Sequence, residues 1–236
     1  MQLKDKLAVV TGGAVRVGRA LARGLAGEGA RVVVHCHESL EEARALAREL
    51  DGHVIQADLA RPGGAATLAD GVLALGGELG VWVNAAATFE RVPFAESDDA
   101  LWQRTLQLVV LSPAALVRRV APAMVDGGVV VNVLDVAARK AWKGYAHHCV
   151  AKAGLAMLTR SLALELAPRL RVCGVSPGLI LPPEGTEPAE LDRLVRRVPL
   201  GRKGGVEDVV QAVVFLTKAD YLTGAVIDVD GGLGAR

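Results

Sequence analysis

A short glycine-bearing turn near the start of the chain constrains the possible folds most. It follows an apolar run at residues 7–10 and precedes an amphipathic helical pattern, and its sequence is Thr11-Gly12-Gly13-Ala14-Val15-Arg16-Val17-Gly18. Glycine lets backbone N–H groups come close to a pyrophosphate, and a helix N-terminus adds partial positive charge. Many turns are glycine-rich, but this one lies on the first strand-to-helix connection, where dinucleotide-binding folds hold phosphate. The turn therefore predicts a phosphate cradle in an α/β fold.

Short β-branched runs alternate with longer helical patterns along the rest of the chain. The expected strands are residues 7–10, 31–35, 53–56, 81–84, 129–134, 171–176 and 225–229. The expected helices are residues 18–26, 40–50, 65–75, 99–124, 145–166, 189–198 and 206–217. Continuously apolar strands separated by helices indicate a parallel sheet that is covered on both faces. We therefore predict a doubly wound Rossmann fold of the α/β class, with a seven-stranded parallel sheet in a single domain over residues 1–236.

Composition and charge limit the kind of partner. Hydrophobic residues make up 51% of the 236 residues, which is enough for a large core. The net charge is +1 without a basic run, and this argues against a nucleic-acid surface. We expect no membrane span, because no apolar stretch is long and uninterrupted enough, and no signal peptide, because the charged residues 1–6 lead straight into a strand. A small molecule is the expected partner.

Cysteines and histidines bear on the compartment and on metal binding. Cys36, Cys149 and Cys173 form no CxxC pair, and this usage suits a reducing environment, so we expect a cytoplasmic protein. His35 and His37 would need a third ligand to hold a metal, and the sequence offers none nearby. We therefore expect no metal site.

The end of the second strand bears on the choice of cofactor. A carboxylate there would hold the adenosine ribose hydroxyls and favour NAD, but the residue is Cys36. Arg16, His37 and Ser39 are each able to contact a 2′-phosphate, and the arginine fork suits a phosphate well. Glu38 argues against NADPH, because its carboxylate would repel the 2′-phosphate. On balance, the residues predict NADPH (NADP) as the cofactor.

Residues 181–188 form an irregular stretch that contains three prolines. Two interpretations stay open for it. It could be a loop over the carboxyl ends of the strands, where such sheets bind ligands, or a plain connector.

Further short motifs follow the expected strands. They are Asp58-Leu59, Asn84, Pro177-Gly178 and the closing Asp230-Gly231-Gly232, and a further motif residue, Lys152, lies within the expected helix at residues 145–166. Together with the Thr-Gly-x-x-x-x-x-Gly turn, they resemble the motifs of the short-chain dehydrogenase/reductase family over essentially the whole chain. The resemblance implies an oxidoreductase whose cofactor contacts are Thr11, Gly12, Arg16, Val17, Gly18, His37, Ser39, Asp58, Leu59, Asn84, Ala85, Lys152, Pro177 and Gly178.

Within that family the chain is most similar to pteridine reductases and dihydromonapterin reductases. It shares with them Arg16 in place of the middle glycine, the run His35-Cys36-His37-Glu38-Ser39, and Asp135 where the wider family has its catalytic serine. Phe89 stands where these enzymes have a phenylalanine that stacks on the pterin ring, although it could equally be an ordinary core aromatic. The resemblance implies that a pterin is bound by Arg16, Phe89, Asp135 and Tyr145.

The chain departs from the family at the catalytic centre. In the Tyr-x-x-x-Lys motif, aligned on Lys152, the tyrosine position holds His148, while Tyr145 keeps the first tyrosine of the Gly-Tyr-x-x-Tyr pattern. The other departures are Val109 for the helix asparagine, Ala85 for the second asparagine after the fourth strand, and Glu38 for an arginine. Cofactor binding is therefore expected to persist while the catalytic machinery is altered.

Three residues are expected to carry the chemistry: Asp135, His148 and Lys152. The resemblance implies that Lys152 holds the nicotinamide ribose, and that Asp135, through water, protonates a ring nitrogen of a dihydropterin. His148 lies one helical turn before Lys152, and an imidazole can donate a proton near neutral pH. Plainer interpretations also stay open, with His148 as a non-catalytic residue at the cleft edge and Asp135 as a strand-end cap.

These residues predict an NADPH-dependent short-chain oxidoreductase that reduces a dihydropterin. Two alternatives remain: a ketone reductase, such as a 3-oxoacyl reductase, that uses His148 as its acid, and a cofactor-binding relative that has lost catalysis. Relatives pair through the long helices, here at 99–124 and 145–166, and through the last strand and helix, so a homotetramer is expected. The apolar faces of these helices, which would be buried in the tetramer or could pack internally, carry Leu106, Val110, Leu158 and Leu162.

Overall fold

The protein folds around one parallel sheet of seven strands, in the order β3-β2-β1-β4-β5-β6-β7. The computed structural model describes residues 1–183 and 185–235. The strands are β1 (Leu7–Val10), β2 (Arg31–Cys36), β3 (His53–Gln56), β4 (Leu79–Asn84), β5 (Met124–Val133), β6 (Arg171–Pro177) and β7 (Val226–Val229). Every pair of neighbouring strands is parallel. The predicted doubly wound fold is confirmed.

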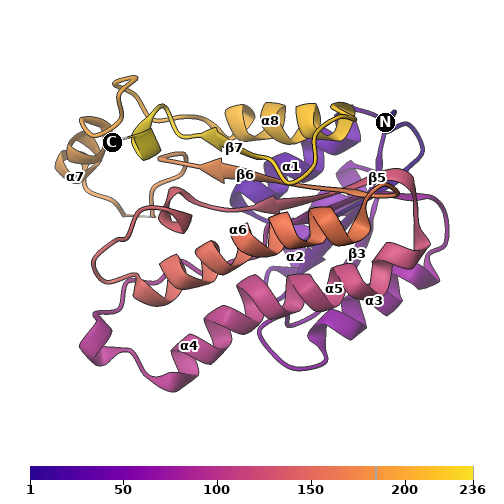
Figure 1. Ribbon diagram of the computed structural model, residues 1–236, viewed down its shortest axis with the longest axis horizontal. Coiled ribbons are helices and arrows are strands. Elements are labelled where there is room, and N and C mark those ends of the chain that lie inside the picture. Colours follow the sequence, from indigo (N-terminus) through magenta and orange to yellow (C-terminus); the bar gives the residue numbers. More distant parts are fainter. Residues whose placement is uncertain (184, 236) are drawn as a thin grey trace.

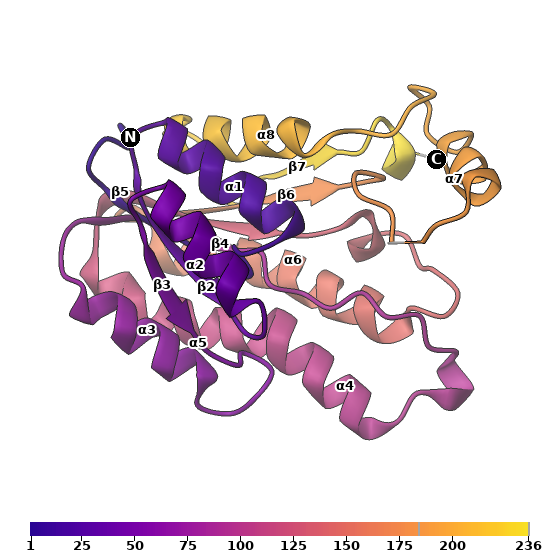
Figure 2. The same ribbon diagram turned by 180° about the vertical axis from the view of Figure 1, so that it is seen from behind.

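Helices cover both faces of the sheet, as Figures 1 and 2 show from opposite sides. One face carries α1 (Arg16–Gly27), α2 (Leu40–Glu49) and α8 (Val206–Lys218). The other carries α3 (Gly64–Ala74), α4 (Asp99–Leu106), α5 (Ser112–Val120) and α6 (Ala146–Leu166). The short helix α7 (Pro188–Val195) lies near the C-terminus, at one end of the molecule (Figure 1).

The central strand β1 shows why these strands are apolar throughout. Ala8 and Val10 pack into the core under α1 and α8, whereas Leu7 and Val9 pack into the core under α3 and α5. Successive residues of a strand point to opposite faces, so a strand covered on both faces needs an apolar side chain at every position. Full burial of each valine or leucine contributes roughly 1.5–3 kcal/mol.

The long helix predicted at residues 99–124 is interrupted. It consists of α4, a π-helical turn at Gln107–Leu111, α5 and a 3₁₀ turn at Ala121–Ala123, and β5 then begins at Met124 rather than at residue 129. Pro113 stands in the first turn of α5, and because it has no N–H to donate, the π-helical turn just before it provides a break in the regular ladder.

This interrupted helix also bears on the expected absence of a membrane span. The helical segment Asp99–Ala123 is long and apolar enough to cross a membrane by length and composition, which the sequence analysis did not anticipate. In the fold, α5 packs against α3 and the π-helical turn packs against α6. Part of its apolar surface therefore belongs to the protein core, since Leu116, Val117 and Val120 are buried there.

The carboxyl ends of the strands bring the predicted site residues to one edge of the sheet. Thr11 follows β1, His37 follows β2, and Asp135 comes just after β5. The proline-rich loop reaches the same edge, because the carbonyl oxygens of Leu181 and Pro182 accept hydrogen bonds from a side chain of the glycine-rich turn. Residue 184 of that loop lies outside the described residues.

Candidate active site

The glycine-rich turn after β1 is fixed from the side of β4. The Thr11 hydroxyl accepts hydrogen bonds from the N–H groups of Ala85 (2.9 Å) and Ala86 (3.0 Å). Gly12 has a φ of +63°, and a Cβ there would lie 3.0 Å from the Cα of Ala86. A Cβ on Gly18 would overlap the carbonyl oxygen of Gly12. The turn therefore packs so closely on β4 and on α1 that both positions require glycine.

The same turn is held from the other side by a buried histidine. The N–H of Gly12 donates to Nδ1 of His35 (3.0 Å), and Nε2 of His35 lies 3.0 Å from the carbonyl oxygen of Ala57. Because Nδ1 accepts, the proton must be on Nε2, which donates to Ala57. His35 is 2% exposed, and this burial lowers its pKa to about 4, so the ring is neutral near pH 7.

This contact corrects one expectation about the phosphate cradle. The N–H of Gly12 is bound to His35 and is not directed outward to a ligand. The first intrahelical donor of α1 is Arg19, whose N–H donates to the Val15 carbonyl (3.0 Å). The N–H groups just before it, those of Arg16, Val17 and Gly18, have no carbonyl of their own helix to bind, and are the donors suited to an anion.

Arg16 occupies an unusual backbone conformation at the start of α1. Its φ is +50°, a left-handed value that glycine adopts without strain, which fits its place at the middle glycine of the family turn. Its guanidinium Nη2 donates to the carbonyl oxygens of Leu181 (2.8 Å) and Pro182 (3.2 Å). Arg16 therefore links the glycine-rich turn to the proline-rich loop.

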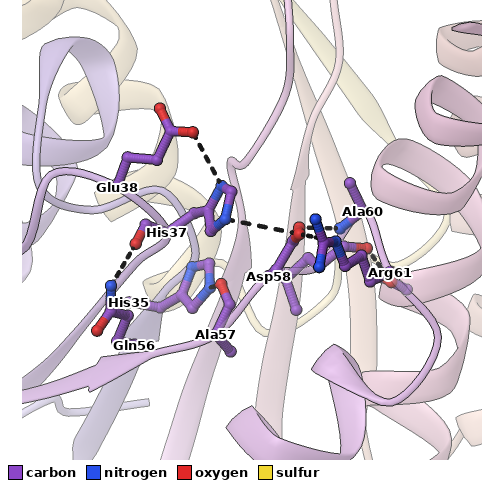
Figure 3. A network of polar contacts seen from close by, with 10 residues as sticks. His35, His37, Glu38, Gln56, Ala57, Asp58, Ala60 and Arg61 are labelled. Carbon is purple, nitrogen blue, oxygen red and sulfur yellow. Dashed lines mark hydrogen bonds and ion pairs between the residues drawn. The ribbon is translucent and has the colours of Figure 1, made fainter.

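At the adenosine end, a charged network joins the loops after β2 and β3 (Figure 3). The ring of His37 lies between two carboxylates, with Nδ1 3.9 Å from Oε1 of Glu38 and Nε2 3.5 Å from Oδ2 of Asp58. Nε of Arg61 lies 3.0 Å from the same Oδ2. Oδ1 of Asp58 accepts from the N–H of Ala60 (2.9 Å). A phosphate here would meet Arg61 as well as the expected His37.

Two other predicted cofactor residues are placed by local structure. Ser39 is the N-cap residue of α2, but within the described chain its side chain makes no capping hydrogen bond. Leu59 is buried, and its carbonyl oxygen accepts a hydrogen bond from the Ser112 hydroxyl (2.6 Å). The hydroxyl of Ser39 is thus available at the end of β2, while Leu59 anchors the loop after β3 to α5.

Asn84 has an internal role that the sequence analysis did not foresee. Its Oδ1 accepts from Nε1 of Trp82 (2.9 Å), and its Nδ2 donates to Oδ1 of Asn132 (2.8 Å). Asn132 in turn donates to the Thr159 hydroxyl (2.8 Å). This buried chain ties β4, β5 and α6 together beneath the site, and it occupies the side chain of Asn84.

The predicted catalytic residues do come together. Asp135 caps the 3₁₀ turn Val136–Ala138 through Oδ1, which accepts from the N–H of Ala137 (2.8 Å). Its Oδ2 lies 3.6 Å from Nε2 of His148. His148 is 2% exposed, and neither of its ring nitrogens has a hydrogen-bond partner within the part of the chain that the structure describes. Asp135 thus caps the 3₁₀ turn with one carboxylate oxygen and lies next to the buried imidazole of His148 with the other.

Lys152 completes this group from one turn further along α6. Its Nζ donates to the carbonyl oxygen of Val133 (2.7 Å). Burial lowers the pKa of Lys152 to about 8, and the nearby charge of Asp135 acts against this shift. The ammonium is therefore still mostly protonated at pH 7, and it lies beneath the end of β5.

An aromatic cluster forms the wall beside His148. The ring of Phe89 stacks on Tyr145 with centroids 4.7 Å apart, and meets the edges of His148 (5.2 Å) and Trp142 (6.1 Å). Phe89 is still 48% exposed, so it is not an ordinary core aromatic. Burial raises the pKa of Tyr145, which keeps its phenol protonated.

The loops after β6 and β7 close the far side of the site. Gly178 donates its N–H to the Val229 carbonyl (3.0 Å), and a Cβ on Gly178 would lie 2.7 Å from the Cα of Asp230. Glycine after Pro177 is thus required by the packing of β6 against β7. Arg139, in the loop before α6, forms an ion pair with Asp228 and fixes that loop to β7.

Three residues of this site escaped the sequence analysis. His35 was noted as a candidate metal ligand and as part of the run at residues 35–39 but was given no part in holding the turn, Arg61 belongs to no motif, and Trp142 lies in an irregular loop. A basic residue three positions after Asp58 was the only available signal for Arg61. Among the described residues, no group of three or more His, Cys, Asp or Glu side chains is placed to hold a metal ion.

Comparison with known proteins identifies the family. The family model described as Enoyl-(Acyl carrier protein) reductase matches residues 13–234. The chain belongs to the short-chain dehydrogenase/reductase family. The family resemblance predicted from the motifs is confirmed.

Relatives within the family act on different substrates, to judge from their names. The short-chain reductase described here is 32% identical to 3beta-hydroxysteroid dehydrogenase 1 of Eggerthella lenta, over 98% of this chain and 94% of that one. It is 34% identical to the 3-oxoacyl-[acyl-carrier-protein] reductase FabG of Aggregatibacter actinomycetemcomitans, over 95% and 98% of the two chains. The crystal structure of FolM Alternative dihydrofolate reductase 1 from Brucella canis, complexed with NADP, matches with a TM-score of 0.93 and 31% identity, over 100% of this chain and 96% of that chain.

Proposed function

We propose that this short-chain reductase is an NADPH-dependent enzyme that reduces a dihydropterin. The observation that carries the proposal is the placement of Asp135 beside buried His148, next to the partly exposed ring of Phe89. The likeness to the FolM reductase structure, which contains NADP, supports both the cofactor and the substrate class.

The chain's own residues have distinct tasks in such a reaction. The cofactor, when bound, supplies a hydride, and the protein must position it and deliver a proton to the substrate. In this proposal Lys152, whose Nζ lies at the carboxyl end of β5, would hold the nicotinamide ribose. Asp135, whose Oδ2 lies 3.6 Å from Nε2 of His148, would relay a proton to a ring nitrogen.

A flat heterocycle suits the wall of the site. Tyr145 covers one part of Phe89, and the exposed remainder of the ring offers a surface for stacking. The guanidinium of Arg16 would bind the polar edge of a pterin or a cofactor phosphate once it leaves the carbonyls of Leu181 and Pro182.

The charges at the adenosine end support NADPH rather than NADH. Cys36 supplies no carboxylate for the ribose hydroxyls. The Arg61 guanidinium and the His37 ring both lie at Asp58, and the charge of the guanidinium offsets the exposed Glu38. A dianionic 2′-phosphate would gain from the Arg61 cation and from a hydrogen bond donated by the His37 ring.

A ketone reductase, such as a 3-oxoacyl reductase, is the second candidate, and a particular observation favours it. His148 occupies the position of the family's proton-donating tyrosine, with both ring nitrogens lacking hydrogen bonds to any described residue. An imidazolium there would give its Nε2 or Nδ1 proton to a carbonyl oxygen. The sequence similarity to FabG is in keeping with this alternative.

The test is NADPH oxidation by the purified protein with a panel of dihydropterins and 3-oxoacyl thioesters. Turnover with a dihydropterin, and little with the thioesters, is the expected result. The reverse pattern would replace the proposal with the ketone reductase. Cofactor binding without turnover of any substrate in the panel would indicate a relative that has lost catalysis.

We also propose that the chain is one domain, is cytoplasmic and forms a homotetramer. Of the residues first assigned to the interface, Leu106, Val110 and Leu158 pack against the small core beside α6, and Leu162 packs against the core under α3 and α5. The exposed apolar stripe lies elsewhere on α6, at positions seven residues apart, and consists of Val150, Met157 and Leu164. This stripe is the surface that an interface would cover.

A further inference from the structure

We infer that His35 is a positioning residue of the cofactor site, whose neutral ring clamps the glycine-rich turn to the loop that follows β3. The inference rests on the proposed function in one respect, because it takes the molecule bound there to be NADPH. His35 is part of the run at residues 35–39 that carries the family resemblance, but that resemblance gives its ring no part in holding the turn.

The position of His35 on β2 makes the clamp possible. β2 lies between β1 and β3 in the sheet, so a side chain near its carboxyl end can contact the loops of both neighbours. Nδ1 accepts from the Gly12 N–H and Nε2 donates to the Ala57 carbonyl, each at 3.0 Å. Figure 3 shows the ring beside Ala57 and below the ring of His37. A single tautomer satisfies both contacts.

Each end of the clamp touches a part of the site that binds a different piece of the cofactor. Gly12 packs directly against the start of α1, because a Cβ on Gly18 would overlap the carbonyl oxygen of Gly12. The position of Gly12 therefore fixes the helix N-terminus that would face a pyrophosphate. Ala57 directly precedes Asp58 of the adenosine-end network. One imidazole therefore fixes the spacing between the pyrophosphate donors and the adenosine loop.

The clamp complements the contact made by Thr11 on the opposite side of the turn. Thr11 ties the turn to Ala85 and Ala86 after β4, whereas His35 ties it to β2 and β3. An apolar residue at position 35 would leave the Gly12 N–H without its acceptor, and a buried unpaired donor is costly. The turn would then move to regain a partner, and the helix end would move with it.

Two substitutions separate the two bonds of the ring. The amide of His35→Asn reaches about as far as Nδ1 and retains an acceptor for Gly12, whereas the amide of His35→Gln reaches about as far as Nε2 and retains a donor for Ala57. Each variant loses one of the two hydrogen bonds. His53→Asn, at the opposite end of neighbouring β3, is the matched control.

The experiment measures the Kd for NADPH by fluorescence titration, together with thermal unfolding. His35→Gln and His35→Asn each break one end of the clamp, so each should weaken NADPH binding by about tenfold or more, while His53→Asn stays within about threefold of wild type. Weakening in which the Kd simply follows the loss of stability across all three variants would show a merely structural role and overturn the inference. Unchanged binding in either His35 variant would overturn it as well.

A second readout does not depend on the cofactor. A two-bond ¹⁵N–¹H correlation spectrum of the free protein should show the proton of His35 on Nε2, and the Gly12 amide should exchange slowly with solvent in wild type and quickly in His35→Gln. A proton on Nδ1 would overturn the clamp. If the wild-type protein binds no NADPH, the proposed function fails and the role of His35 in cofactor binding fails with it. The spectrum then still decides whether the clamp exists.

Discussion

Oδ2 of Asp135 lies 3.6 Å from Nε2 of His148, in the place where the family has a tyrosine near its catalytic centre. The carboxylate is held by the Ala137 N–H, and the imidazole is buried against Phe89. Two proton-carrying groups therefore lie side by side above Lys152. Which of them delivers the proton distinguishes the two candidate reactions.

Replacing Asp135 by asparagine tests the dihydropterin reaction. The amide retains an oxygen to cap the turn at Ala137 but cannot carry the proton, so turnover of a dihydropterin should fall by at least ~10²-fold. The Kd for NADPH should hardly change, because Asp135 is expected to face the substrate rather than the phosphates. Steady-state kinetics and a cofactor titration measure the two effects. A normal rate in Asp135→Asn would argue against this role.

Replacing His148 tests the ketone-reductase alternative. Phenylalanine would fill the buried space without a titratable nitrogen, so in the pterin reaction His148→Phe should cost much less than Asp135→Asn. His148→Tyr should raise activity on oxidised pterins or simple ketones, because it restores the phenol that the family motif has at this position. If His148→Phe abolishes turnover while Asp135→Asn leaves it intact, the pterin assignment fails.

The cofactor preference should depend on the Arg61 cation at the adenosine end. NADPH should bind at least roughly tenfold tighter than NADH, a difference of about 1.4 kcal/mol. Arg61→Ala should reduce that preference by removing one cation from the network, while leaving the Kd for NADH nearly unchanged. Glu38→Arg should strengthen NADPH binding by removing a repulsive carboxylate. Equal dissociation constants for the two cofactors in wild type would contradict the prediction.

Stability should fall in acid because of His35. Its pKa is lowered from 6.5 to about 4 in the folded protein, so the unfolded chain binds a proton more readily between these values. Stability from this group is present above pH 6.5 and is lost as the pH falls toward 4, by up to about 3 kcal/mol. The titratable neighbours of the ring are His37 and Asp58.

Urea unfolding across this pH range measures the effect. The comparison is with His35→Asn, which retains the neighbouring His37 and Asp58 but lacks the imidazole. The loss of stability in acid should be smaller in the variant by about the contribution of His35. Identical pH profiles of stability in wild type and variant would show that the His35 ring does not control the loss of stability in acid.

The assembly should depend on the exposed stripe of α6. A charge at its centre, in Met157→Asp, should convert the proposed homotetramer to a smaller species, because an interface disfavours an unpaired buried charge. Leu73→Asp places the same charge on a partly exposed leucine of α3 and should leave the mass unchanged. Light scattering at micromolar concentration measures the mass, and a monomeric wild type would contradict the prediction.

The sequence by itself determined the fold and the family. Strands apolar at every position, such as Leu7–Val10, can be buried only in a sheet covered on both faces, and helical periodicity between them makes the sheet parallel. The motif residues Thr11, Gly12 and Gly18 were also recognisable from the sequence. The backbone segments of this turn lie so close together that few side chains fit between them. The local sequence pattern was sufficient to predict these features because burial and backbone geometry restrict the residue types at each position.

Only the tertiary structure decided how the side chains of the site are used. His35 and Asn84 have partners on other strands and loops, and no sequence spacing encodes the distance between residues 12 and 35 or between residues 84 and 132. The same holds for Phe89, whose stacking on Tyr145 depends on where two separate loops meet. Burial patterns are local along the chain, whereas hydrogen bonds and ring contacts between loops arise only once the sheet has brought the ends of its strands together.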